Sequence, residues 1–135
     1  MMPLSLNDIR KKIGYFCPIS NPTVFAKTEL LKHFNYNEKL RVGEDYSLWI
    51  TLIKHKKILL NMEEPTIYYR RGTDFLNRRR GIKYASSDFY NKISTISVAP
   101  FWQKIIIFFF AILSFFVRLL PKKLFNFIRN LKHND

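Results

Sequence analysis

Two adjacent carboxylates, Glu44 and Asp45, are the side chains of this sequence best placed to do chemistry. They follow Gly43 directly, and a segment rich in apolar and aromatic residues comes after them. The apolar residues of 48–53 recur at helical spacing, so the pattern predicts a helix that begins at the pair. A carboxylate held at such a loop-to-helix junction can take a proton from a bound hydroxyl group, as a general base does.

A structural role explains the same pattern. Acidic residues are common in the first turn of a helix, because the free backbone N–H groups and the helix dipole attract negative charge there. The local sequence therefore leaves two roles open for Glu44 and Asp45, namely stabilisation of a helix start and catalysis.

Four short motifs surround the pair in a fixed order. They are Asn21-Pro22-Thr23, Tyr36-Asn37-Glu38, Glu44-Asp45-Tyr46-x-Leu48-Trp49 and Pro65-x-x-Tyr68-Tyr69-Arg70. This order resembles the C-terminal half of family 2 glycosyltransferases of the GT-A type, over about residues 17–80. The resemblance implies inverting transfer of a sugar from a nucleotide-sugar to a hydroxyl of a lipid-linked or saccharide acceptor. The products of such enzymes are cell-surface polysaccharide or lipopolysaccharide.

The same motif match implies roles for individual residues. Asp45 would be the catalytic base, and Glu44 would orient the loop or the acceptor. Arg70 matches the family's Tyr-Arg pair and, with Arg78, is expected to bind substrate phosphate, because guanidinium groups fit phosphate oxygens. For the basic cluster of arginines at 70, 71 and 78–80, a solvated helix face is the alternative and the more common role of such a charge run.

Aromatic residues of the Glu-Asp motif are candidates for sugar binding. Tyr46 and Trp49 could stack on a sugar ring. Trp49 also falls on the apolar side of the predicted helix, so a position in the core is the alternative for it.

Two parts of the family pattern are missing from this sequence. One is the metal-binding Asp-x-Asp, and the other is the N-terminal nucleotide-binding half of about 100 residues with alternating strands and helices. We therefore expect this 135-residue chain to be a C-terminal piece of an α/β fold. No cofactor is expected within it, and a divalent cation (Mg or Mn) is expected only for the complete enzyme.

The expected elements are mostly helices with a few short strands. Helices are predicted over 5–13, 28–34, 45–57 and from Thr73-Asp74 onward, and 15–25 is predicted to be irregular or an edge strand. Short strands are predicted at Ile58–Leu60 and Thr66–Arg70. As an isolated fragment this is an α+β arrangement. We assign 1–97 to the acceptor-side part of a catalytic domain and 98–135 to membrane-associating helices.

The C-terminal region suggests contact with a membrane. Ile105 to Val117 is an uncharged run of 13 residues, shorter than the roughly 20 that a simple span needs. After Pro121, apolar residues at helical spacing alternate with Lys122 and Lys123, the profile of an interfacial helix on an anionic bilayer. A core helix and a true span are the alternatives. The interfacial interpretation predicts a location at the cytoplasmic face of the inner or plasma membrane.

Composition limits the other classes of function. With 23 Lys and Arg against 10 Asp and Glu, the net charge is +13, which favours polyanionic partners. No nucleic-acid recognition motif is present and the chain contains 13 Phe, so we expect no nucleic-acid partner. The single Cys17 and the spacing of the three His predict no metal site. A non-enzymatic basic peripheral membrane protein is the alternative to a transferase fragment.

Overall fold

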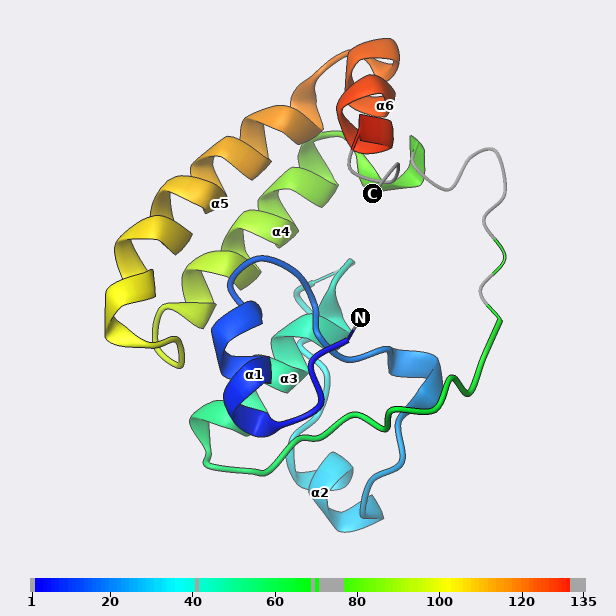
Figure 1. Ribbon diagram of the computed structural model, residues 1–135, viewed down its shortest axis with the longest axis vertical. Coiled ribbons are helices and arrows are strands. Elements are labelled where there is room, and N and C mark those ends of the chain that lie inside the picture. The colour runs from blue at the N-terminus through cyan, green and yellow to red at the C-terminus, as the bar shows by residue number, and fades with distance from the viewer. Residues whose placement is uncertain (1, 41, 69, 71–76, 132–135) are drawn as a thin grey trace.

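The computed structural model describes residues 2–40, 42–68, 70 and 77–131 (Figure 1). Within these ranges the chain forms the α-helices α1 (Leu6–Lys12), α2 (Thr28–His33), α3 (Glu44–Lys54), α4 (Ile82–Thr95), α5 (Lys104–Leu119) and α6 (Lys122–Leu131). Short 3-10 turns lie at η1 (Asn21–Thr23), η2 (Asn77–Arg79) and η3 (Phe101–Gln103). The expectation of a mostly helical chain is confirmed for the described residues.

Local chemistry accounts for several helix ends. The Ser5 hydroxyl oxygen accepts a hydrogen bond from the backbone N–H of Asp8 at 3.2 Å, which caps the start of α1. Basic residues occupy the last turn of α1, where they suit the negative end of the helix dipole. Pro121 separates α5 from α6, because a proline cannot continue the helix that precedes it.

The hydrophobic core is built around α3. Leu48, Trp49 and Leu52 are almost fully buried on this helix, and Ile9 and Ile13 from the α1 region pack against them. The predicted amphipathic helix after Asp45 is thereby confirmed, although it ends at Lys54 rather than near Lys57.

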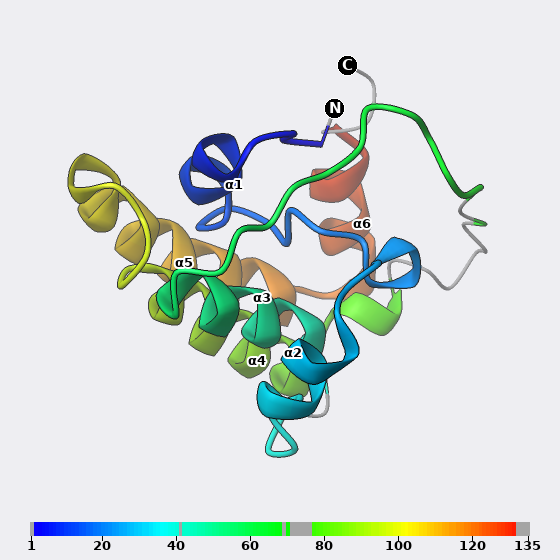
Figure 2. The ribbon, with the colours of Figure 1, turned by 90° about the horizontal axis from the view of Figure 1, so that it is seen from below.

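Helices α4 and α5 form an antiparallel pair. Figures 1 and 2 show them side by side along much of their lengths, with α1 and α3 against one side of the pair. The side of α5 that packs inward carries Ile107, Ala111, Ser114 and Arg118, at spacings of four, three and four. Since α4 and α5 pack together, the predicted division at residue 97 separates two helices that share one interface.

The predicted short strands are wrong for the residues that the structure describes. Ile58–Leu60 and residues 66–68 run without regular secondary structure, and no strand occurs elsewhere in the described ranges. A strand needs a neighbouring strand to take up its backbone hydrogen bonds, and these segments have no such neighbour in the described chain. The backbone N–H of Asn61 instead donates to the carbonyl of Leu4.

Two further expectations concern boundaries. The predicted helix start at Thr73-Asp74 lies outside the described residues, and α4 begins at Ile82. Gly81 precedes it with φ of 90°, a conformation that favours glycine. The region 15–25 is irregular, as expected, and contains the turn η1.

Candidate functional site at the start of α3

The start of α3 places the carboxylate pair at the edge of the core. Gly43 is the N-cap residue and has φ of 72°, a left-handed conformation that glycine adopts at little cost. Glu44 and Asp45 are the first two residues of the helix, and both are partly exposed. One oxygen of Asp45 accepts the backbone N–H of Tyr46 at 2.7 Å. Asp45 therefore does stabilise the first turn, and it does so through a single carboxylate oxygen.

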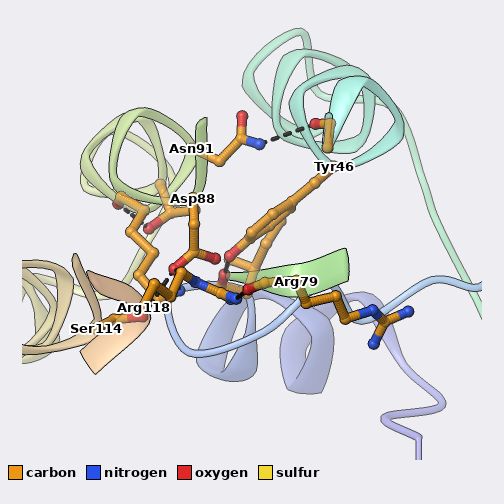
Figure 3. Close-up of polar contacts among 10 residues, drawn as sticks. Tyr46, Arg79, Asp88, Asn91, Ser114 and Arg118 are labelled. Carbon is orange, nitrogen blue, oxygen red and sulfur yellow. Dashed lines mark hydrogen bonds and ion pairs between the residues drawn. The ribbon is translucent and has the colours of Figure 1, made fainter. Parts of the chain in front are cut away.

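Asn91 of α4 holds this helix start in place. Its side-chain amide nitrogen donates to the carbonyl oxygen of Gly43 at 2.8 Å (Figure 3), and Asn91 is 1% exposed. A Cβ atom added to Gly43 would lie 2.8 Å from the same nitrogen. The contact thus requires glycine at position 43 for its backbone conformation and for the space that it leaves.

The surroundings of Asp45 make it a stronger base than an ordinary aspartate. Burial raises its pKa, and the charge of Glu44 acts in the same direction. Hydrogen bonds from the backbone N–H groups of Tyr46 and of Asp45 itself, and the charge of Arg79, lower the pKa by less. The result is a half-buried carboxylate with a raised pKa.

A second acid, Asp88 of α4, lies in a different environment. Its Oδ2 atom accepts hydrogen bonds from Lys92 Nζ at 2.5 Å, Ser114 Oγ at 2.7 Å and Arg118 Nε at 3.0 Å (Figure 3). Burial raises the pKa of Asp88, but the two cations outweigh it and lower the pKa to about 2. Asp88 therefore stays ionised at neutral pH and links α4 to α5.

Arg118 connects this network to the segment that carries Arg79. Its Nη1 atom donates to the carbonyl of Arg79 at 2.7 Å, and its own carbonyl accepts the N–H of Gly81 at 2.9 Å. The guanidinium also lies over the ring of Tyr84, 4.8 Å from the centroid. The end of α5 thereby holds η2 and the residue that precedes α4.

The structure brings together some of the predicted site residues and not others. Glu44 and Asp45 lie together at the start of α3, and the charge of Arg79 acts on Asp45, whereas Arg70 and Arg78 are exposed. Arg79 was part of the predicted arginine cluster but was not singled out.

The two aromatic candidates are core residues. Tyr46 is 5% exposed and its hydroxyl donates to the carbonyl of Ile13, while Trp49 is 2% exposed. Neither ring is open to a ligand in this arrangement, so we propose no stacking role for them. For Trp49, the sequence left sugar stacking and a core position as alternatives, and the structure has the core position.

Tyr84, Asp88 and Asn91 are not among the residues that the sequence motifs predict, and Arg118 is predicted only as the charge that ends the apolar run. Two signals were available, since Asp88 and Lys92 have the spacing of a helical ion pair and Arg118 interrupts an apolar segment. Nothing local pointed to Asn91, because its partner is the backbone of a residue 48 positions away.

The described residues contain no metal site. Within them no three His, Cys, Asp or Glu side chains converge as the ligands of an ion would. They do not fit the divalent cation that the family resemblance implies for a complete enzyme.

Two surface cavities are found away from Asp45. One, of about 250 Å³, lies between α4 and α5 and is lined by Phe89, Ile112, Phe115 and Phe116. The other, of about 310 Å³, lies near the N-terminus beside Pro3 and Lys11. Neither includes the carboxylate pair, so they do not form a pocket for a substrate of Asp45.

Comparisons with known proteins link the chain to sugar transfer. It is 32% identical over 92 residues to the amylovoran biosynthesis glycosyltransferase AmsE of Erwinia amylovora, and 30% identical over 88 residues to an uncharacterized glycosyltransferase of Haemophilus influenzae. Each match covers 64% of this chain, and the chain spans about a third of each relative (33% and 32%). No protein-family model and no solved structure matches the chain.

Proposed function

We propose that this chain is the acceptor-side part of an inverting glycosyltransferase of the GT-A type, and that Asp45 is its general base. The observation that carries the proposal is the half-buried Asp45 carboxylate with a raised pKa, held at a clamped helix start. The similarity to two curated glycosyltransferases supports the reaction class. The motifs Glu44-Asp45-Tyr46-x-Leu48-Trp49 and Tyr68-Tyr69-Arg70 support the family.

The proposed reaction forms one bond to the anomeric carbon while another breaks. The acceptor hydroxyl oxygen attacks this carbon from the face opposite the nucleoside diphosphate, and the bond to the diphosphate oxygen breaks. Asp45 takes the hydroxyl proton as the new glycosidic bond forms. The electron pair of the broken bond leaves with the diphosphate, and the configuration at the carbon is inverted.

The features of the α3 start suit this role. The Tyr46 N–H and the clamp by Asn91 restrict the motion of Asp45, which is what a base that works by position requires. A raised pKa makes the carboxylate a better proton acceptor. The charge of Arg79 acts on Asp45, which supports assigning to Arg79 the phosphate-contacting role that the resemblance suggested for Arg70 and Arg78.

The chain is proposed to act as part of a longer or assembled enzyme. It spans about a third of its relatives, so the nucleotide-sugar site and a divalent cation are assigned to the remaining portion. The similarity to the amylovoran biosynthesis glycosyltransferase supports a role in polysaccharide biosynthesis, and the family resemblance suggests that the product is a cell-surface polysaccharide.

A chimera tests this function. The aligned third of the Erwinia amylovora relative is replaced by this chain, and amylovoran production is measured in cells that lack the native gene. We expect the chimera to restore production and Asp45→Asn to lower transfer by about 10²–10⁴-fold, the usual contribution of a general base. Glu29→Gln is the matched control, because Glu29 is an exposed acid in the first turn of another helix, α2, and its loss is expected to leave the activity unchanged.

The pH dependence gives a second readout. The base must be ionised, so transfer by the chimera is expected to rise with pH through a pKa above the ordinary aspartate value of 3.8. An inactive parent chimera would count against the acceptor-side assignment. Full activity in the Asp45→Asn variant would show that another group takes the proton.

A further inference from the structure

The outer side of α5 and of the turn η3 before it carries a continuous apolar stripe. Its members, spaced by three, four, four and three residues, are Trp102, Ile105, Phe109, Leu113 and Phe116. These side chains are 60–71% exposed. The exposed residues of α5 are all apolar, so its outer side presents no hydrogen-bonding side chain. We call this set the aromatic stripe.

The opposite side of α5 fixes the direction in which the stripe faces. Ile107 and Ala111 are fully buried, and Ser114 and Arg118 are bonded to Asp88 of α4. Rotating α5 to bury the stripe against the described chain would break the ion pair and expose Ile107. The stripe is therefore held outward by the packing of its own helix.

The charges around the stripe are of one sign. Residues 89–134 contain no Asp or Glu, and they include Lys104 at the start of α5 and Lys122 and Lys123 directly after it. A fully apolar strip with cations at both ends complements a bilayer surface that carries anionic headgroups. Protein interfaces, in contrast, usually include a polar rim and distributed hydrogen bonds.

We infer that the aromatic stripe binds an anionic phospholipid bilayer, with α5 lying in the plane of the membrane surface. The apolar side chains enter the boundary between headgroups and acyl chains, while Lys104, Lys122 and Lys123 contact lipid phosphate. Helix α4 and the core around α3 stay on the water side. This inference does not depend on the proposed transferase activity.

An in-plane position fits α5 better than a span. Phe101–Leu119 is a 19-residue stretch long and apolar enough to cross a membrane, and 11% of it is buried. The α5 helix itself has 16 residues, about 24 Å of length against a hydrocarbon core of about 30 Å. Spanning would also draw the partners of Arg118 into hydrocarbon, because Asp88 and Lys92 belong to the same buried network.

Vesicle binding by the full chain tests the inference. The probes are vesicles of phosphatidylcholine mixed with phosphatidylglycerol, and vesicles of phosphatidylcholine alone. We expect binding to the anionic vesicles that weakens in high salt and is much weaker on neutral ones. Phe109→Gln and Leu113→Gln should each lower the partition coefficient about tenfold or more, because each removes a large apolar group from the interface.

Phe25→Gln is the matched control, since Phe25 is fully exposed but lies outside α5. It should bind vesicles like the unchanged chain. Circular dichroism of all variants checks that the helices are retained. Unchanged binding in both stripe variants, or an equal loss in the Phe25 variant, would overturn the inference.

Fluorescence of Trp102 measures how deeply the stripe enters the bilayer. Its contribution is the difference between the unchanged chain and Trp102→Phe, because Trp49 is buried in the core. Quenching by lipids brominated near the headgroup end of the acyl chain supports the in-plane position. Strongest quenching from the bilayer centre indicates a span, and no quenching contradicts membrane contact.

A second copy of this chain is the competing occupant of the stripe. Sedimentation without lipid distinguishes it, because a monomer is expected at the concentrations of the vesicle assay. A dimer that Phe109→Gln dissociates, together with no vesicle binding, would overturn the inference.

Discussion

Two carboxylates of this chain show how the surroundings of a side chain determine what it can do. Asp45 is half-buried, with backbone N–H donors and an acidic neighbour, and its pKa is raised. Asp88 receives hydrogen bonds from Lys92, Ser114 and Arg118, and its pKa is lowered to about 2. The first is therefore suited to accept a proton, while the second is a permanently charged link between helices.

Removal of the Asp88 charge is predicted to destabilise the chain strongly. Asp88→Asn leaves Lys92 and Arg118 buried beside an uncharged amide, so the free energy of unfolding should fall by about 3–5 kcal/mol. Urea unfolding at neutral pH measures this. The control Asp8→Asn affects an exposed pair with Lys11 and should change stability by at most about 1 kcal/mol.

The lowered pKa of Asp88 predicts that part of the free energy of unfolding depends on pH. Because the folded pKa is about 2 against an ordinary value of 3.8, this contribution is complete above about pH 4. As pH falls from 3.8 toward 2, about 2 kcal/mol should be lost. Repeating the urea unfolding over this range should show the loss in the unchanged chain and its absence in Asp88→Asn. The same acid loss in both chains would rule out Asp88 as its source.

At the scale of elements, the start of α3 depends on a helix that is distant in sequence. Gly43 supplies the left-handed conformation, and Asn91 of α4 holds its carbonyl. The helix itself follows from its apolar spacing and its acidic first turn, which are local properties. Its position relative to α4 follows from one buried amide whose importance no local pattern indicates.

Substitution at Gly43 is predicted to disturb this contact. Gly43→Ala adds a Cβ that crowds Asn91 Nδ2 at a positive φ, so it should cost more than the 1–2 kcal/mol of left-handed strain alone. Thermal unfolding of Gly43→Ala, Asn91→Ala and the double variant measures the coupling. Gly43→Ala should lower the free energy of unfolding by less in the Asn91→Ala background than in the unchanged chain. An equal cost in both backgrounds would show that the two residues do not interact.

At the scale of the molecule, the described chain is organised by the packing of α5 on α4. The apolar run at 105–117 predicts a membrane-associating segment, and exposed apolar side chains cover one side of it. Its other side packs against the rest of the molecule, because Ile107 lies against Gly14 and Arg118 forms an ion pair with Asp88. The helix therefore has a structural role in addition to the membrane role that we infer.

Truncation at the predicted domain boundary is expected to disrupt folding. A 1–97 variant lacks α5, so α4 loses the helix that packs along it, and Asp88 loses Arg118. We expect it to lose cooperative thermal unfolding by circular dichroism, whereas a 1–121 variant that lacks only α6 should retain it. Cooperative unfolding of 1–97 would show instead that 98–135 is a separate unit.

The sequence alone determined the features that depend on neighbours a few residues away. The helices at 6–12, 28–33 and 44–54, the carboxylates at a helix start and the break at Pro121 were all predictable, because helical hydrogen bonds join residues four apart. Only the tertiary structure decided that the predicted strand segments lack partners and that Asp88, Ser114 and Arg118 meet. It also decided which side of α5 faces outward. These features arise from contacts between distant segments, and such contacts leave no local pattern in the sequence.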